Sequence, residues 1–159
     1  MTASPPDPPF SFSRETDIRI DADGHFWHEG TRVTHERLQR ALASWIDVDP
    51  ETGRYILKNQ VQWCFIQVDD APLVVRSAQV TGDGSALDLS LSDGTRERLD
   101  PASLRLVGDV PYCRVRGGKL PARFAPQAAF VLLERVSEED TGPVLHLGDR
   151  ALPLPRAAR

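Results

Sequence analysis

The sequence predicts an α+β protein made of two small, similar α+β domains, each with an antiparallel sheet and one helix. Short runs of alternating apolar and polar residues are separated by turns rich in Gly and Asp, as is typical of antiparallel strands. Two longer segments show helical apolar spacing, and no regular strand–helix alternation favours a parallel sheet. The order strand, Gly turn, strand, helix, strand occurs in residues 25–57 and again in 112–147, which indicates an internal duplication.

A β-hairpin opens the first half of the chain. Ile18 and Ile20 alternate with charged residues, the letters DADG supply a turn, and HFWHE continues as an extended aromatic run. A second turn at Glu29-Gly30 leads into a short strand that ends near Val33. We therefore expect two successive hairpins before the first helix.

A helix is predicted over residues 35–46, because apolar residues recur there with helical spacing. Thr34 is the predicted N-cap. Val33 and Leu38 would then pack against each other as a hydrophobic staple across that cap. The apolar positions of the helix are Leu38, Ala41, Leu42, Trp45 and Ile46.

Strands make up most of the remaining chain. Period-two patterns predict strands between residues 55 and 99, and PYCRV and LPARF follow as two more. A second helix is predicted to begin at Pro126, with an apolar face broad enough for it to be well buried, before a closing hairpin with a two-residue turn. The predicted domains are a disordered proline-rich arm (1–15), an N-terminal α+β domain (16–72) and a C-terminal α+β domain (73–155).

The composition limits the class of partner. The 19 basic and 23 acidic residues give a formal net charge of −4, which argues against a dedicated nucleic-acid binder. No apolar run reaches the roughly 18 residues of a membrane span, and no signal-peptide pattern occurs, so we expect no membrane partner. Cys64 and Cys113 fall inside strands without CxxC spacing, which favours reduced core thiols and a cytoplasmic location.

The stretch DIRIDADGHFWHEG is rich in carboxylates and imidazoles, but its spacing does not fit a metal site. An EF-hand loop centred on Gly24 would need ligands at the positions of Arg19 and Gly30. His25 and His28 are an odd number of residues apart on an extended strand and point to opposite faces, and no cluster elsewhere completes a zinc site. The sequence therefore predicts no metal and no cofactor.

Catalytic motifs are also missing. The chain contains no GxSxG elbow, no P-loop and no GxGxxG, and its glycine-rich stretches fall in hairpin turns. We therefore predict no catalytic residue and no enzyme. An enzyme that uses His28 with Glu29 or Asp21 ranks last among the functions considered.

The candidate ligand site lies in a locally cationic stretch, since no acidic residue occurs between Asp109 and Glu134. Strand alternation places Tyr112, Arg114 and Arg116 on one face, and a helix start nearby favours an anion. An aromatic ring beside guanidinium groups can stack a base and bind a phosphate. The competing interpretation is a solvated strand face balanced by acidic residues on neighbouring strands. The predicted ligand-binding residues are Trp27, His28, Tyr112, Arg114, Arg116 and Arg123.

Several stretches together resemble a bacterial family of unknown function, DUF1285. They are IRIDADGHFWHEGTRV, YILKNQVQWCFIQVDDAPL, PYCRVRGGKLPARF and GDRALPL. The most specific pieces are the I-x-I-D-x-x-G-x-x-x-H-x-G pattern and the D-A-P triplet. They are carried by Ile18, Ile20, Asp21, Gly24, His28, Gly30, Asp70, Ala71 and Pro72.

The resemblance implies a duplicated two-domain α+β protein with a pleckstrin-homology-like second half. It also implies a ligand site at the domain interface, a nucleotide-like ligand and a signalling role. The sequence departs from the family pattern at residues 59–65, where NQVQWCF replaces two basic positions of relatives, and in the last hairpin, which lacks the usual tryptophan.

These observations favour a non-catalytic cytoplasmic ligand-binding or sensory module for a nucleotide-like anionic small molecule in signalling. The alternative is a protein-interaction adaptor or a homo-oligomeric module without a small ligand. In that case Phe26, Trp27 and Trp63 would mark the partner surface, and a strand edge would complete the pairing.

Overall fold

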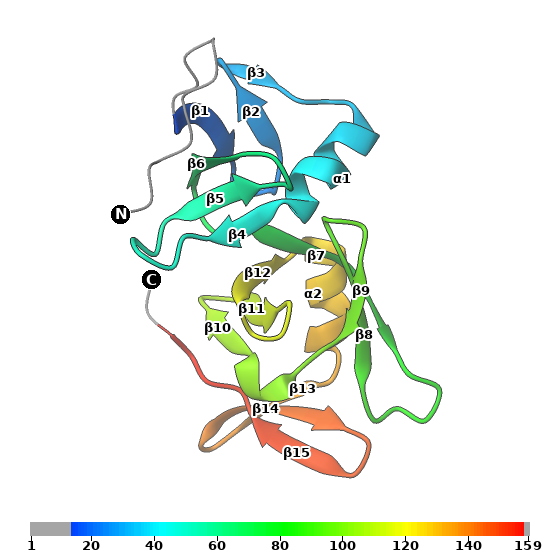
Figure 1. Ribbon diagram of the computed structural model, residues 1–159. Coiled ribbons are helices and arrows are strands. Elements are labelled where there is room, and N and C mark those ends of the chain that lie inside the picture. The colour runs from blue at the N-terminus through cyan, green and yellow to red at the C-terminus, as the bar shows by residue number, and fades with distance from the viewer. Residues whose placement is uncertain (1–13, 158–159) are drawn as a thin grey trace, which may run out of the picture.

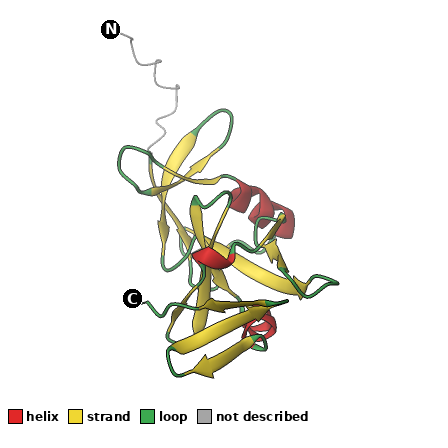
Figure 2. Ribbon diagram, turned by 90° about the horizontal axis from the view of Figure 1, so that it is seen from below, coloured by secondary structure: helices red, strands yellow, loops and turns green. Residues whose placement is uncertain are grey.

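The computed structural model describes residues 14–157, which form three sheets stacked along the length of the molecule (Figure 1). Strands account for more of this part of the chain than helices do, and the helices are short (Figure 2). The predicted α+β class is confirmed. No helix in the described range is long and apolar enough to cross a membrane.

The first sheet has six strands in the order β3-β2-β1-β6-β5-β4. Its elements are β1 (Glu15–Ile20), β2 (Phe26–His28), β3 (Thr31–Arg32), α1 (Glu36–Ser44), β4 (Ile46–Val48), β5 (Tyr55–Lys58) and β6 (Trp63–Val68). The second sheet has the order β10-β11-β12-β7-β8-β9. Its elements are β7 (Leu73–Val80), β8 (Leu87–Leu91), β9 (Arg96–Arg98), the 3-10 helix η1 (Pro101–Ser103), β10 (Arg105–Val107), β11 (Val110–Val115) and β12 (Leu120–Phe124).

A helix and a small third sheet complete the fold. The helix α2 begins at Pro126, as predicted, and the third sheet is an antiparallel meander in the order β13-β14-β15. Leu147 pairs with Arg150, so the closing hairpin has the predicted two-residue turn. The elements are α2 (Pro126–Leu133), β13 (Val136–Glu139), β14 (Gly142–Leu147) and β15 (Arg150–Pro153).

The two six-stranded sheets have the same topology. Each contains two three-stranded antiparallel meanders, joined at the centre by a parallel pair between its first and last strands. These parallel pairs, β1 with β6 and β7 with β12, depart from the purely antiparallel sheets that were predicted. The letters GTR also recur at residues 30–32 and 94–96, in the equivalent turn of each sheet.

The structural repeat therefore relates residues 15–68 to residues 73–124, whereas the sequence predicted a repeat between 25–57 and 112–147. In the second copy η1 takes the place of α1 between the third and fourth strands. A three-residue 3-10 helix carries no apolar periodicity, so the sequence pattern matched α1 to α2 instead. The helix α2 and the third sheet follow the second copy as an addition.

The first helix begins one residue later than predicted. His35, not Thr34, is its N-cap, and the His35 Nδ1 accepts the Leu38 N–H at 3.3 Å. Leu38 is 45% exposed, so the predicted staple with Val33 is wrong. The helix also ends earlier, because Trp45 is its C-cap and Ile46 starts β4.

One hydrophobic core runs through the molecule and joins all three sheets. It includes Ile20 and Phe26 from the first sheet, Leu73 from the second and Leu145 from the third. The helix α2 was predicted to be well buried, but only part of it is, since Phe130 on that helix is 66% exposed. The shared core means that the sheets pack as one body rather than as separate lobes.

Gly24 offers a test of the packing between the first two sheets. It has φ +84°, and an added Cβ would lie 2.6 Å from Cγ2 of the buried Val74 on β7. Gly24→Ala should therefore cost several kcal/mol, the sum of about 1 kcal/mol for the left-handed backbone and about 2 kcal/mol for overpacking. Gly30→Ala is the matched control, because Gly30 has φ +76° in open space. Urea denaturation that gives equal losses for both variants would contradict this packing.

Candidate functional site

The linker between the first two sheets fixes two of the predicted ligand residues. The Tyr112 hydroxyl donates to Asp70 Oδ2 at 2.6 Å, and Arg123 lies 3.4 Å from the same oxygen. Tyr112 is buried in a small cluster with Ala71 and Val107. The D-A-P triplet therefore attaches the linker to the second sheet, and Tyr112 and Arg123 meet on its carboxylate.

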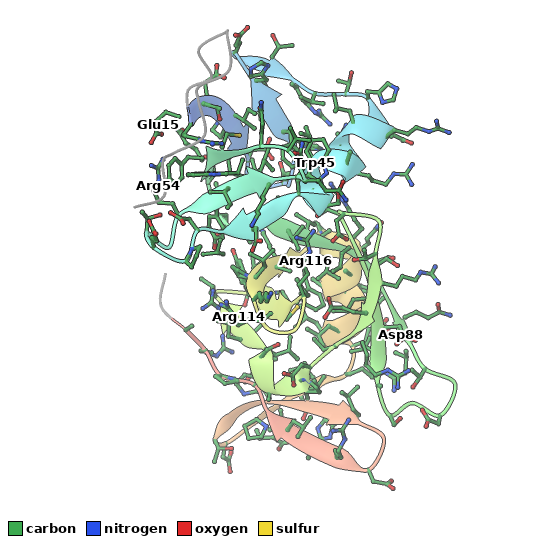
Figure 3. All side chains as sticks on the ribbon, viewed as in Figure 1. Glu15, Trp45, Arg54, Asp88, Arg114 and Arg116 are labelled. Atoms are coloured by element: carbon green, nitrogen blue, oxygen red, sulfur yellow. The ribbon has the colours of Figure 1, made fainter. Side chains whose placement is uncertain are left out.

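Arg116 connects the second sheet to the first helix. Its guanidinium donates to the Ala43 carbonyl at 2.7 Å, to the Ile46 carbonyl at 2.6 Å and to Asp93 Oδ2 at 2.7 Å. Asp93 belongs to the β8–β9 turn, and its side chain is 1% exposed. We call this arrangement the Arg116 clamp; Figure 3 shows Arg116 at the boundary of the two sheets.

The Asp93 carboxylate is ionised within the clamp. Burial raises the pKa of this carboxyl, but hydrogen bonds from Thr95 and Arg116 outweigh burial and lower the pKa below its usual value. The charge of Arg116 is therefore neutralised by an acidic residue from a distant turn. Neutralisation by an acidic residue from elsewhere in the sheet is what the competing interpretation of the cationic stretch predicted.

Arg114 does not share a face with Arg116, because β11 ends at Val115 and Arg116 has a left-handed backbone with φ +53°. Arg114 is exposed, and its guanidinium donates to the carbonyls of Gly118 at 2.7 Å and Lys119 at 3.0 Å. It therefore braces the turn between β11 and β12. The predicted cationic face of three residues is not formed.

The remaining two predicted residues lie in the first sheet. The Trp27 indole N–H donates to Asp21 Oδ2 at 2.8 Å, and the His28 ring lies 3.5 Å from Asp17. His28 is exposed, and Trp27 is half-buried. The six predicted residues thus lie at separate places, with Tyr112 and Arg123 the pair that the structure brings together.

Within residues 14–157, one group of potential metal ligands occurs, in the turn after β1. Ligand atoms of Asp21, Asp23 and His25 lie within 4.8 Å of one another. The Asp21 carboxylate, however, already accepts the backbone N–H groups of Asp23 and His25 and the Trp27 indole. Burial raises the Asp21 pKa, but these hydrogen bonds produce a net decrease. This geometry is that of a turn stabilised by an aspartate.

A cationic cleft of about 460 Å³ lies between α1 and the β7–β8 side of the second sheet. We call it the arginine cleft. Its arginines come from three elements, namely Arg32 on β3, Arg40 on α1 and Arg76 on β7. No ion pair joins any of them to a carboxylate within residues 14–157, although Glu36 also lines the cleft. Its other polar lining residues include His25, Thr34, Gln39 and Ser92.

Backbone geometry brings the walls of the arginine cleft together. Gly94 turns the chain between β8 and β9 with φ +84°, and an added Cβ would lie 3.1 Å from Cδ of Arg40. The opposite wall is the start of α1, whose first N–H groups favour an anion. A cleft with these walls and three guanidinium groups can bind phosphate or carboxylate oxygens.

A second, smaller cleft of about 220 Å³ lies at the other end of α1. We call it the tryptophan–lysine cleft. Trp45 caps α1 and Lys58 ends β5, whereas Arg116 and Lys119 lie in the turn between β11 and β12. Asp47 is the acidic residue that lines it.

The residues of the arginine cleft share no local sequence pattern, so they were not among the predicted ligand-binding residues. Arg32 and Arg76 are 44 positions apart, and each lies in a stretch that reads as an ordinary strand end or strand. The sequence holds one weak signal for this cleft, because an alignment of the two sequence repeats would match the Glu29-Gly30 turn with the Asp93-Gly94 turn. Gly94 from the second of these turns lines the cleft, as does Arg32, which follows the first.

Comparisons with known proteins agree with this fold. Residues 7–71 match the family model described as domain of unknown function (DUF1285), N-terminal domain. A crystal structure of a DUF1285 family protein from Silicibacter pomeroyi DSS-3 has 25% sequence identity and a TM-score of 0.73, and the match covers 89% of this chain and 80% of that one. A DUF1285 family protein from Shewanella baltica OS155 has 23% identity and a TM-score of 0.64, covering 77% and 94%. No curated protein matches the chain.

The fold and the two clefts define a small α+β protein with a repeated six-stranded sheet and cationic clefts at the junction of the copies. Residues 7–71 match the model of the N-terminal domain of the DUF1285 family, and the fold is similar to that of a crystal structure of a DUF1285 family protein. The family resemblance found in the sequence is thus confirmed.

Replacing Arg116 should separate its structural role from a ligand role. Arg116→Ala leaves the buried Asp93 without its charged partner and should cost about 3 kcal/mol of unfolding free energy. Arg114→Ala is the matched control; it removes exposed hydrogen bonds and should cost less than about 1 kcal/mol. Chemical denaturation of both variants measures the difference. If Arg116→Ala were as stable as Arg114→Ala, the clamp would not stabilise the fold.

Chelation tests the turn after β1. Because the Asp21 oxygens already accept hydrogen bonds from the protein, EDTA should leave the melting temperature unchanged. The measurement is a thermal melt with and without EDTA. A fall of several degrees that zinc or calcium reverses would show that the turn binds a metal.

Proposed function

We propose that this protein is a non-catalytic ligand-binding or sensory module of the cytoplasm, and that a nucleotide-like anionic small molecule binds in the arginine cleft. The observation that carries the proposal is the set of three arginines without a carboxylate partner in that cleft. Arginine presents a planar fork that binds phosphate oxygens in pairs. Charges left without a partner inside a cleft are favourable only when solvent or a ligand balances them.

The size and lining of the cleft suit a small ligand. Its volume of about 460 Å³ falls in the range of roughly 300–1,000 Å³ that is typical of small-molecule sites. The His25 ring offers a flat surface, and the hydroxyls of Thr34 and Ser92 offer hydrogen bonds beside the arginines. These groups support a phosphate with an attached ring or sugar rather than an apolar ligand.

A ligand in this cleft would contact both copies of the repeated sheet. Arg32 and Arg40 belong to the first copy, and Arg76 belongs to the second. Binding would therefore couple ligand concentration to the stability of the junction, as a sensor requires.

The thiols give no support to a catalytic function. Both cysteines are free and buried. Burial raises the pKa of the Cys113 thiol to about 12, so the thiol stays protonated and is a poor nucleophile. Buried reduced thiols are also consistent with the proposed cytoplasmic location.

The alternative, an interaction or homo-oligomeric module, retains one supporting observation, the 66% exposure of Phe130 on α2. The partner surface predicted from sequence is less suitable. Phe26 is buried, and the guanidinium of Arg14 lies 4.4 Å from the centre of the Trp63 ring. The arginine cleft therefore carries the preferred proposal.

A thermal-shift screen tests the ligand. Nucleoside phosphates and inorganic phosphate are added to the wild type and to Arg32→Gln, Arg40→Gln and Arg76→Gln. A ligand at about a hundredfold its dissociation constant should stabilise the fold by roughly 2.7 kcal/mol, and each substitution should reduce this shift. Arg37→Gln is the control, because Arg37 is exposed on the same helix but does not line the cleft.

Two outcomes would count against the proposal. One is that no nucleotide and no phosphate stabilises the wild type. The other is a shift that survives all three cleft substitutions, which would place the ligand elsewhere. Concentration-dependent association in the absence of any ligand shift would favour the interaction module.

A further inference from the structure

We propose that the tryptophan–lysine cleft is a second binding site, for a flat ring-bearing molecule that carries one anionic group. The site is separate from the arginine cleft and goes beyond the proposed function. In this site the indole of Trp45 would stack on the ring of the ligand, and the ammonium groups of Lys58 and Lys119 would bind its anionic group.

Both lysines of the chain line the tryptophan–lysine cleft. Seventeen of the 19 basic residues are arginines, and Lys58 and Lys119 are the two lysines. Although 61 positions separate them in the sequence, both line this one cleft, from opposite sides of the junction. Neither ammonium group makes a hydrogen bond or ion pair with any residue that the structure describes. Two compact cations thus face the same space without a protein partner.

The first sheet fixes Trp45 and Lys58 beside each other. The Lys58 N–H donates to the Trp45 carbonyl at 2.7 Å and continues the register in which Ile46 pairs with Leu57. Lys58 is exposed at the end of β5, and the half-buried Trp45 packs partly against the hydrophobic core while it also lines the cleft. The ring and the first cation of the site therefore sit on rigid backbone.

The second sheet supplies Lys119 from a braced turn. Arg114 donates to the carbonyls of Gly118 and Lys119, and the Lys119 N–H donates to the Arg116 carbonyl. The Arg116 clamp joins this turn to the end of α1. Arg114 and Arg116 are thus positioning residues, whereas the lysines remain available for a ligand.

The chemistry of the lining defines the ligand class. Ammonium groups bind carboxylate or phosphate oxygens as point charges, without the paired geometry that arginine imposes. The half-buried indole of Trp45 offers apolar surface for a planar ring. A neighbouring surface depression shares Trp45, Asp47 and Lys58 and extends over Asn59 and Val61, which leaves room for substituents on the ring.

The two clefts are physically distinct. The arginine cleft includes the first turns of α1, and the tryptophan–lysine cleft includes its last residues. The Arg116 clamp, which contacts Ala43, Ile46 and Asp93, lies at the C-terminal end of α1, beside the tryptophan–lysine cleft. Their linings share no residue, so substitutions can test each cleft alone.

The scarcity of lysine permits a direct measurement. Reductive methylation with ¹³C-formaldehyde keeps the charge of each ammonium and gives one NMR signal for each lysine, with the α-amino group of the chain as internal control. The probes are phenyl phosphate and benzoate, which combine a ring with an anionic group, and inorganic phosphate, which has no ring. The relative affinity of the first two probes distinguishes a phosphate ligand from a carboxylate ligand.

We expect phenyl phosphate or benzoate to shift both lysine signals but not the α-amino signal, and inorganic phosphate to bind at least about tenfold more weakly. Lys58→Gln and Lys119→Gln should each assign one signal and weaken binding by about tenfold, as for a lost charge-assisted hydrogen bond. The proposal is overturned if no ring-bearing probe shifts the lysine signals, or if inorganic phosphate shifts them at the same concentration.

Two further variants distinguish binding from unfolding. Asp47 is exposed and is the acidic residue of the cleft, so Asp47→Asn should tighten the binding of phenyl phosphate. Trp45→Leu should weaken phenyl phosphate but not inorganic phosphate, because only the ring contact is lost. Weaker binding by Asp47→Asn would contradict the site. Since the lysine signals report this cleft and the arginine variants report the other, either proposal can fail alone.

Discussion

The arrangement of the first two sheets depends on the hydrogen bonds and the ion pair that the Arg116 guanidinium makes across their junction. The guanidinium satisfies two carbonyls at the end of α1 and binds the ionised Asp93 of the β8–β9 turn, so one side chain joins an element of the first sheet to two turns of the second. A buried carboxylate and the exposed carbonyls of a helix end would each be unfavourable alone. Their shared partner makes the junction a single, specific contact.

The clefts follow from this contact and from the linker. Asp70 is bound by Tyr112 and Arg123, and Ala71 is buried, so the chain between the sheets is attached along its length. With the linker and the clamp both fixed, the surfaces at the two ends of α1 face the second sheet without filling the space between them. Cationic side chains from both sheets then converge on spaces that neither sheet forms alone.

The repeated topology explains why the junction lies where it does. Each copy ends with its last strand parallel to its first, so the chain leaves the first sheet from the centre and enters the second sheet at the centre. The equivalent turns Glu29-Gly30 and Asp93-Gly94 have different roles in the two copies. The turn of the second copy, with its buried aspartate, became part of the junction, whereas the turn of the first copy is exposed.

The sequence by itself determined the α+β class, most strands, the hairpin turns and the start of α2, because these depend on apolar periodicity and on Gly or Asp in turns, which are local properties. It also carried the family resemblance. It did not determine the parallel strand pairs or the frame of the repeat, since each depends on strands distant in sequence. The sequence also offered Thr34 as the N-cap of α1, one residue before His35, which makes the local cap contact with Leu38. Only the tertiary structure decided which cations have carboxylate partners, because Asp70 and Asp93 neutralise Arg123 and Arg116 from other elements. The three arginines of the arginine cleft and the two lysines form no ion pair with a carboxylate within residues 14–157.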